Sequence, residues 1–171
     1  MPIMIPARAA TEETVAHDPR IRPLQAALPH VHESAWGLEF LRKCSITRIE
    51  CFQFGAKPFG READMRGLIA LSTNTGIVGL QEFAVPRKSL KGDLVMWAAP
   101  FQRMKGMNMA EGIRFPQLKK DVWGTERVAF IESAFVDLID KYGRKGNEGE
   151  ERSDYLDRAW LFEHAQAYVA F

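Results

Sequence analysis

The carboxylate of Glu82, at the end of the stretch Gly79-Leu-Gln-Glu82, is a candidate catalytic acid or base. A catalytic acid or base needs a partner group within hydrogen-bond reach, and no such partner lies near Glu82 in the sequence. The alternative is a structural carboxylate at the end of a strand, bonded to backbone or facing a missing part of the protein. We assign no catalytic residue.

Two further pairs could bind ligands. His30 and His32 would point to one side of an extended segment and supply half of a zinc site, but no third or fourth ligand follows at metal-like spacing. We therefore predict a surface loop there and no metal site. Asp137 and Asp140, beside Lys141, fit a solvated helix face better than a pair of acid/base carboxylates.

A loop with two basic and two acidic residues spans positions 55–64, with the sequence Gly-Ala-Lys-Pro-Phe-Gly-Arg-Glu-Ala-Asp. Lys57 and Arg61 could bind a carboxylate by charge-assisted hydrogen bonds, with Phe59 as an apolar tip. These three residues and Glu82 are the candidates for a substrate-facing surface. An ordinary solvent loop is the alternative.

Composition excludes several classes of protein. The chain has 171 residues, a net charge of +1 and 46% hydrophobic residues, so we expect one globular domain, or one domain with appendages. Without a basic block, neither nucleic acid nor a membrane surface is an expected partner. No apolar run is long enough to span a membrane and no signal peptide is expected, so we predict a cytoplasmic protein with Cys44 and Cys51 as reduced thiols.

Three strands are predicted in the first half. Residues 66–82 contain two apolar runs around Asn74-Thr75-Gly76, which is typical of a tight antiparallel hairpin. The third candidate strand is Ile46–Phe54, with Cys51 as a small core residue.

Helices are predicted on both sides of these strands. The N-terminal ones are a short helix from Asp18 to Ala27, ended by Pro29, and one over 35–43 capped by Ser34. Helical spacing continues after Pro86, at Leu90, Leu94, Trp97, Ala98 and Phe101, and residues 106–124 are expected to be irregular. An apolar stripe predicts a helix over 125–142, and a last helix is expected over 153–169, with Leu156, Trp160 and Tyr168 as anchors.

The order of these patterns resembles a known family. Three segments carry the likeness: Ile46-Thr-Arg-Ile-Glu50, the stretch Ser72-Thr-Asn-Thr-Gly-Ile-Val-Gly79 with Glu82, and Ile131-Glu-Ser-Ala-Phe-Val-Asp-Leu-Ile-Asp-Lys-Tyr-Gly143. Their order is similar to that in the N-terminal capping domain of the mandelate racemase/muconate-lactonizing branch of the enolase superfamily. On this match Glu132, Ala134 and Asp137 occupy the positions of an acidic, a small and an aspartate residue. The likeness covers about residues 45–145.

The resemblance implies a substrate-specificity domain, with loop 55–64 as the flap over the mouth of a catalytic barrel. The family's acid/base residues and three magnesium-binding carboxylates lie on that barrel, which takes about 250 residues. Only residues 144–171 follow Gly143, so none of these residues can be assigned here. We expect no cofactor in this chain, and magnesium only if a barrel partner supplies the ligands.

We therefore predict an α+β fold, a three-stranded antiparallel sheet packed on a helical bundle with extra terminal helices. The predicted parts are an arm with short helices (1–44), the cap-like domain (45–145) and a polar linker with a C-terminal helix (146–171). The leading hypothesis is a cap-like protein that is not catalytic alone and acts with a barrel subunit of racemase, dehydratase or lactonizing type. The alternative is an independent homo-oligomeric binding or scaffold module.

An oligomer is expected because a cap without its barrel exposes apolar surface. The terminal segments, with Trp36, Phe40, Leu156 and Trp160, could instead fold back over that surface. The stretch 96–109, which holds four methionines, is either core filler or a second contact surface. Leu71, Val78 and Ile131 are predicted to be buried between sheet and helix.

Overall fold

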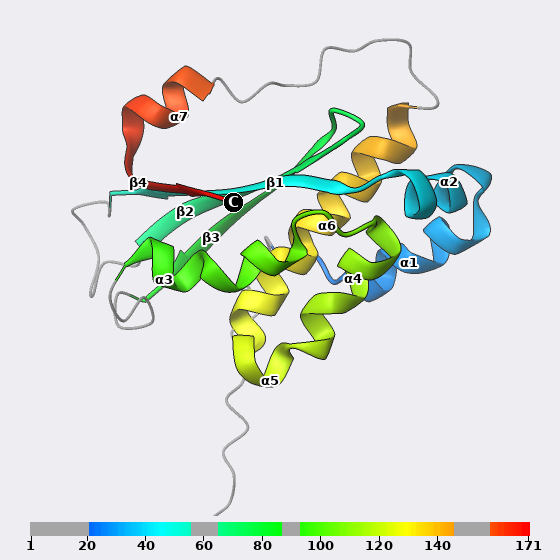
Figure 1. Cartoon of the computed structure of the whole chain (residues 1–171), viewed down its shortest axis with the longest axis horizontal. Coiled ribbons are helices and arrows are strands. Elements are labelled where there is room, and N and C mark those ends of the chain that lie inside the picture. Colours follow the sequence, from blue (N-terminus) through cyan, green and yellow to red (C-terminus); the bar gives the residue numbers. More distant parts are fainter. Residues whose placement is uncertain (1–20, 56–64, 87–92, 146–157) are drawn as a thin grey trace, which may run out of the picture.

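The computed structural model describes residues 21–55, 65–86, 93–145 and 158–171, and Figure 1 shows their arrangement. Lys57, Phe59 and Arg61 of the loop 55–64 lie outside the described residues, as do Leu90, Leu156 and the predicted start of the first helix at Asp18.

The predicted strands form the centre of the fold. They are β1 (Ile46–Phe54), β2 (Met65–Thr73) and β3 (Val78–Val85), and each pairs antiparallel with the next. The β2–β3 hairpin closes where the Thr73 amide donates to the Ile77 carbonyl at 3.1 Å, and Gly76 has φ 79°. A glycine adopts this left-handed conformation without the steric penalty of a Cβ atom.

The sheet has four strands and not three. The helix predicted over 153–169 is wrong in its second half, because α7 (Arg158–His164) gives way to β4 (Ala165–Ala170), which pairs antiparallel with β1. The strand order is β3-β2-β1-β4. The free edge of β1 accounts for the difference: it offers backbone hydrogen bonds to a segment containing Tyr168 and Val169, residue types that favour strands, and this tertiary pairing outweighs the helical spacing.

The N-terminal helices are α1 (Leu24–Glu33) and α2 (Ala35–Lys43), and Ser34 caps α2 as predicted, accepting from the Gly37 amide at 3.1 Å. Pro29 was expected to end the first helix but lies inside α1. Burial of Leu24 and Val31 in the core compensates for the one helical hydrogen bond that a proline removes.

The region after β3 is more helical than predicted. It contains α3 (Leu94–Ala98), the 3-10 helix η2 (Ala99–Met104), α4 (Met109–Leu118) and α5 (Lys120–Trp123). The expectation of an irregular segment over 106–124 is therefore wrong. The signal was Asn108, whose side chain caps α4 by accepting from the Glu111 amide at 2.9 Å.

The long helix α6 (Thr125–Lys145) packs against β3 and β2 on the helical side of the sheet, and α7 lies on the opposite side (Figure 1). Leu71 and Ile131 are fully buried, as predicted. Val78 is only half-buried. That prediction is wrong because the side chains of β3 alternate: Gly79, Gln81 and Phe83 face α6 and the core, whereas Val78 faces the other side.

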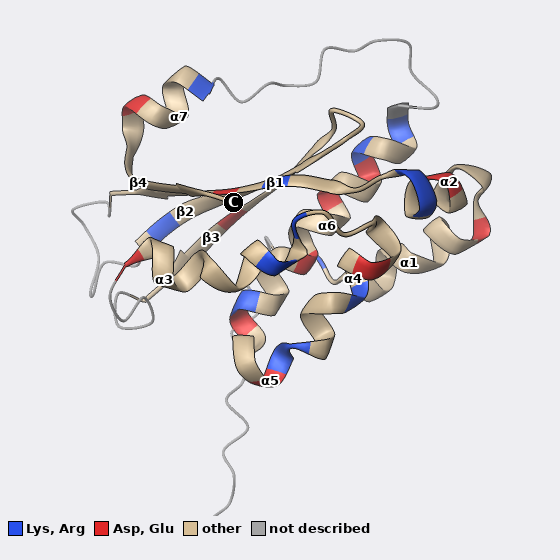
Figure 2. Ribbon diagram, in the orientation of Figure 1, with Lys and Arg blue, Asp and Glu red and all other residues tan. Residues whose placement is uncertain are grey.

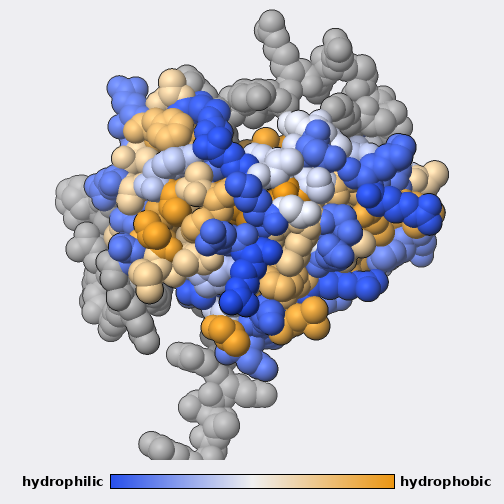
Figure 3. Space-filling view, in the orientation of Figure 1, coloured by the Kyte–Doolittle hydropathy of each residue, from blue (hydrophilic) through white to orange (hydrophobic). Residues whose placement is uncertain are grey.

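The methionine-rich stretch is mostly core. Met104 and Met109 are fully buried, whereas Met96 is 70% exposed. Hydrophobic and hydrophilic residues are interspersed over the face in Figure 3, and both acidic and basic residues are scattered over the helical part of the fold in Figure 2. None of the described helices is both long and apolar enough to cross a membrane.

Candidate functional site

Glu82 is exposed on the edge strand β3, directly opposite Leu68 of β2. Leu68 belongs to a small apolar cluster with Phe52 and Leu161 of α7, so Glu82 lies on the α7 side of the sheet. The backbone carbonyl of Glu82 accepts from the Gln81 side chain at 2.6 Å.

Strands β1 and β2 flank the loop 55–64 as a paired stem. Phe54, the last residue of β1, pairs with Arg66 of β2, so these two strand ends lie next to each other. The ring of Trp160 from α7 lies 6.0 Å from that of Phe54. An exposed arginine and two aromatic rings therefore flank the base of the loop.

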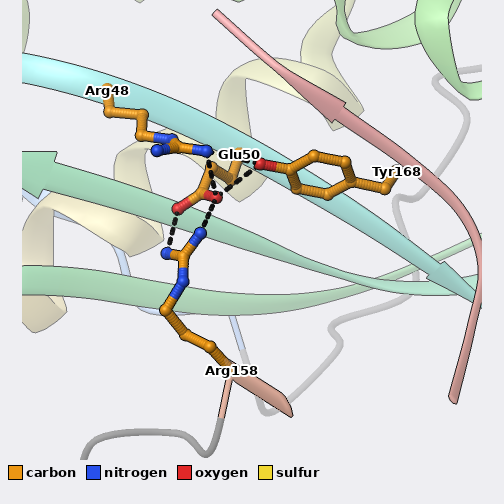
Figure 4. Close-up of polar contacts among 4 residues, drawn as sticks. All are labelled: Arg48, Glu50, Arg158 and Tyr168. Carbon is orange, nitrogen blue, oxygen red and sulfur yellow. Dashed lines mark hydrogen bonds and ion pairs between the residues drawn. The ribbon is translucent and has the colours of Figure 1, made fainter. Parts of the chain in front are cut away.

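A buried carboxylate occupies the centre of the α7 side of the sheet (Figure 4). The side chain of Glu50 on β1 is 1% exposed and accepts two hydrogen bonds from the guanidinium of Arg158, at 2.8 and 2.7 Å. The hydroxyl of Tyr168 donates to Glu50 at 2.7 Å, and Arg48 lies 3.2 Å from the same oxygen. We call these four residues the Glu50 cluster.

The Glu50 cluster contains one carboxylate and two guanidinium groups. Burial raises the pKa of Glu50, but the hydrogen bonds from Arg158 and Tyr168 and the charges of both arginines outweigh it, so that the pKa lies below its ordinary value. The hydrogen bond to Glu50 raises the pKa of Arg158. Glu50 is thus an ionised hydrogen-bond acceptor, and its role is to hold α7 and β4 against β1.

The acidic positions of α6 are also structural. The carboxylate of Asp137 accepts from the Leu80 amide at 2.8 Å and pairs with Lys141 at 2.7 Å, and Lys141 donates to the Val78 carbonyl at 3.0 Å. The prediction of a solvated face is therefore wrong for Asp137, which binds the edge of β3. Asp140 pairs with Arg22.

Glu132 is a second buried carboxylate, 8% exposed, and it accepts from the Gln117 side chain at 2.6 Å. Burial raises the pKa of Glu132, and the hydrogen bond from Gln117 and the charge of Lys120 lower it by less. Glu132 therefore ties α6 to α4, at the position where the resembled family has an acidic residue.

His30 and His32 are exposed on α1, a helix rather than the extended segment considered above, so the two rings do not share a side. No group of three or more His, Cys, Asp or Glu side chains in the described ranges is placed to bind a metal ion. His30 borders an open hollow of about 410 Å³, whose other lining residues are Ala27, Trp36, Ile139, Asp140, Gly143 and Arg144.

Sequence reasoning missed the Glu50 cluster. One signal was available: Glu50 stands between Ile49 and Cys51 in an apolar strand, where a carboxylate needs a cationic partner. The partner could not be found from the sequence, because Arg158 is 108 residues away and lies in a segment whose strand was predicted as helix.

Two solved structures are similar to about half of this chain. One is described as a mandelate racemase/muconate lactonizing enzyme from Aspergillus oryzae, with 20% identity over 49% of this chain and a TM-score of 0.32. The other is described as a dehydratase from Zymomonas mobilis ZM4, with 28% identity over 48% of this chain and a TM-score of 0.34. The chain spans 24% and 21% of these longer proteins. No protein-family model and no curated protein matches the sequence.

Proposed function

We propose that this chain is a cap-like module that has no chemical step of its own and acts beside a barrel-bearing subunit that holds a carboxylate or sugar-acid substrate. The chain would contribute substrate selection. Its contact surface would be the loop 55–64, with Lys57 and Arg61 toward the substrate carboxylate and Phe59 toward its apolar part.

The observation that carries this proposal is the stem of the loop. Phe54 and Arg66, which flank segment 55–64, are paired in register within a four-stranded sheet. Loops that select a ligand work best when a rigid scaffold fixes their ends. Arg66, exposed at the same end, would add a third positive charge close to the carboxylate.

The Glu50 cluster supports the non-catalytic part of the proposal. A general acid or base at neutral pH needs a pKa near that pH. Glu50 instead has a lowered pKa and accepts hydrogen bonds from Arg158 at both carboxylate oxygens, so it stays ionised and bound to this partner. If the chain is part of an enzyme, the reaction class is that of the resembled branch, a magnesium-dependent racemase, dehydratase or lactonizing reaction, with metal ligands supplied by the barrel.

The experiment is reconstitution with a barrel-bearing chain encoded in a neighbouring reading frame. Both chains are purified separately, and exchange of the proton next to a sugar-acid carboxylate is followed by NMR in deuterated water with magnesium. The proposal expects exchange to increase when the two chains are mixed and to fall at least tenfold with a Lys57→Ala/Arg61→Ala double variant. An Arg42→Ala/Arg103→Ala variant, which removes two positive charges far from the loop in sequence, is the matched control. Exchange that is indifferent to this chain would contradict the proposal.

A second candidate function is a homo-oligomeric binding or scaffold module without an enzymatic role. The backbone along the outer edge of β4 favours it, since this edge can pair with another strand.

A further inference from the structure

The two edges of the sheet differ. Along β3, side chains occupy backbone groups that point away from the sheet: Lys141 donates to the Val78 carbonyl, and Asp137 accepts from the Leu80 amide. The Gln81 side chain donates to the carbonyl of Glu82. Side chains that cover an edge in this way prevent another strand from pairing there.

Helix α3 packs against β4, but no side chain of the described residues is hydrogen-bonded to the outward backbone groups of this edge. Phe171 and Ile49 exchange two backbone hydrogen bonds, at 2.9 and 3.3 Å, and Ala170 is opposite Glu50. In an antiparallel pair the neighbours of a hydrogen-bonded residue point their backbone groups outward, so those of Tyr168 and Ala170 face away from β1. Within the described ranges no backbone or side-chain group bonds to these outward groups.

The composition of β4 also permits pairing. Its sequence, Ala165-Gln-Ala-Tyr-Val-Ala170, contains no charged residue and no proline, the two features that commonly protect edge strands. Ala167 and Val169 are half-buried against the main core, so their remaining exposed area would be covered by an added strand.

We propose that β4 is a dimerisation edge that takes the β4 strand of a second copy of this chain, antiparallel across a two-fold axis at Val169. In this register Tyr168 of each copy pairs with Ala170 of the other, and every outward backbone group of these two residues is bonded. The result is a continuous eight-stranded sheet. This inference does not depend on the cap-like function proposed first, and it deepens the homo-oligomeric alternative.

A second copy fits this edge better than an unrelated strand. An uncharged strand meets itself without like-charge repulsion, and the two-fold register leaves neither copy with an unpaired outward group at Tyr168 or Ala170. Because Asp137 and Lys141 cover β3, pairing through β4 alone closes at two copies and does not propagate into a fibre.

The test compares two proline variants by light scattering over a wide range of concentration. Ala170→Pro removes one outward amide of β4 without removing a bond to β1, and Ala84→Pro makes the matching change on β3. The monomer mass is 19.4 kDa. The proposal expects twice that mass for the unaltered chain and for Ala84→Pro at high concentration, and the monomer mass for Ala170→Pro. A monomeric unaltered chain, or an Ala170→Pro variant that dimerises normally, would overturn it.

Amide hydrogen exchange provides a second readout on the unaltered chain, which serves if Ala170→Pro does not fold. Protection of the Tyr168 and Ala170 amides should rise with protein concentration, whereas that of Cys51, in the sheet interior, should not change. Protection of Tyr168 and Ala170 that is independent of concentration would overturn the proposal. Neither readout involves carboxylate turnover, so its failure is distinguishable from failure of the proposed function.

Discussion

The guanidinium of Arg158 binds both carboxylate oxygens of Glu50, at 2.8 and 2.7 Å, across 108 residues of sequence. This fork joins the first residue of α7 to the middle of β1. Tyr168 adds a third hydrogen bond from β4, so the C-terminal segment contacts one buried carboxylate from two elements. Without these partners Glu50 would be a charge with almost no contact with water, which is strongly unfavourable.

Replacing Arg158 should destabilise the fold. Arg158→Ala leaves Glu50 buried with Tyr168 and Arg48 as its remaining partners, and we expect a loss of about 1–3 kcal/mol in the free energy of unfolding. The upper limit is modest because the side chain of Arg158 is 42% exposed. Urea denaturation measures the loss. Arg42→Ala, an exposed arginine in the last turn of α2, is the control and should change stability by less than about 0.5 kcal/mol.

Stability should depend on pH through Glu50. Because its pKa is lowered from 4.5 by folding, the unfolded chain takes up the proton first as the pH falls, and the stabilisation from ionised Glu50 is lost below about pH 4.5. The difference in unfolding free energy between the unaltered chain and Glu50→Gln should be full at pH 6–7 and shrink as the pH falls through this range.

Glu132 should make stability depend on pH in the opposite direction. Its pKa is raised by burial, so its ionisation costs stability above the ordinary value of 4.5, and no cost remains at pH values where both states are protonated. Glu132→Gln should therefore be at least as stable as the unaltered chain at pH 7, and the two should converge on acidification. Parallel pH profiles for Glu50→Gln and Glu132→Gln would contradict this assignment.

The packing of α6 on the sheet is tested by Ile131, which is fully buried. Ile131→Ala should cost about 2–5 kcal/mol, since it removes apolar contacts and leaves a cavity. The matched control is Val122→Ala, because Val122 is 81% exposed on α5. Equal thermal midpoints for the two variants would show that the described packing is wrong.

The sequence was sufficient for the elements whose signals are local. The Asn74-Thr75-Gly76 turn, the Ser34 cap and the apolar stripe of α6 each depend on residues a few positions apart, and all three were predicted. Strand β4 was missed because its formation depends on the free edge of β1, more than a hundred residues earlier in the chain. The role of Glu50 was missed for the same reason.

Predictions about exposure failed where a side chain's face was decided by strand alternation. Val78 is apolar, but its position on β3 turns it away from α6. Asp137 was expected in solvent, but its carboxylate accepts a hydrogen bond from the backbone of β3 and pairs with Lys141, one helical turn away. Residues 56–64 lie outside the described part of the chain, so Lys57, Phe59 and Arg61 remain predictions.

The central claim is that this chain carries no proton-abstraction chemistry of its own. The most direct measurement is NMR of mandelate and a panel of sugar acids in deuterated water, with magnesium and the purified chain alone. The account predicts that the proton next to the carboxylate exchanges for deuterium no faster than in a sample without protein. Exchange catalysed by the isolated chain would contradict it, provided that the activity persists after the protein has been purified to constant specific activity.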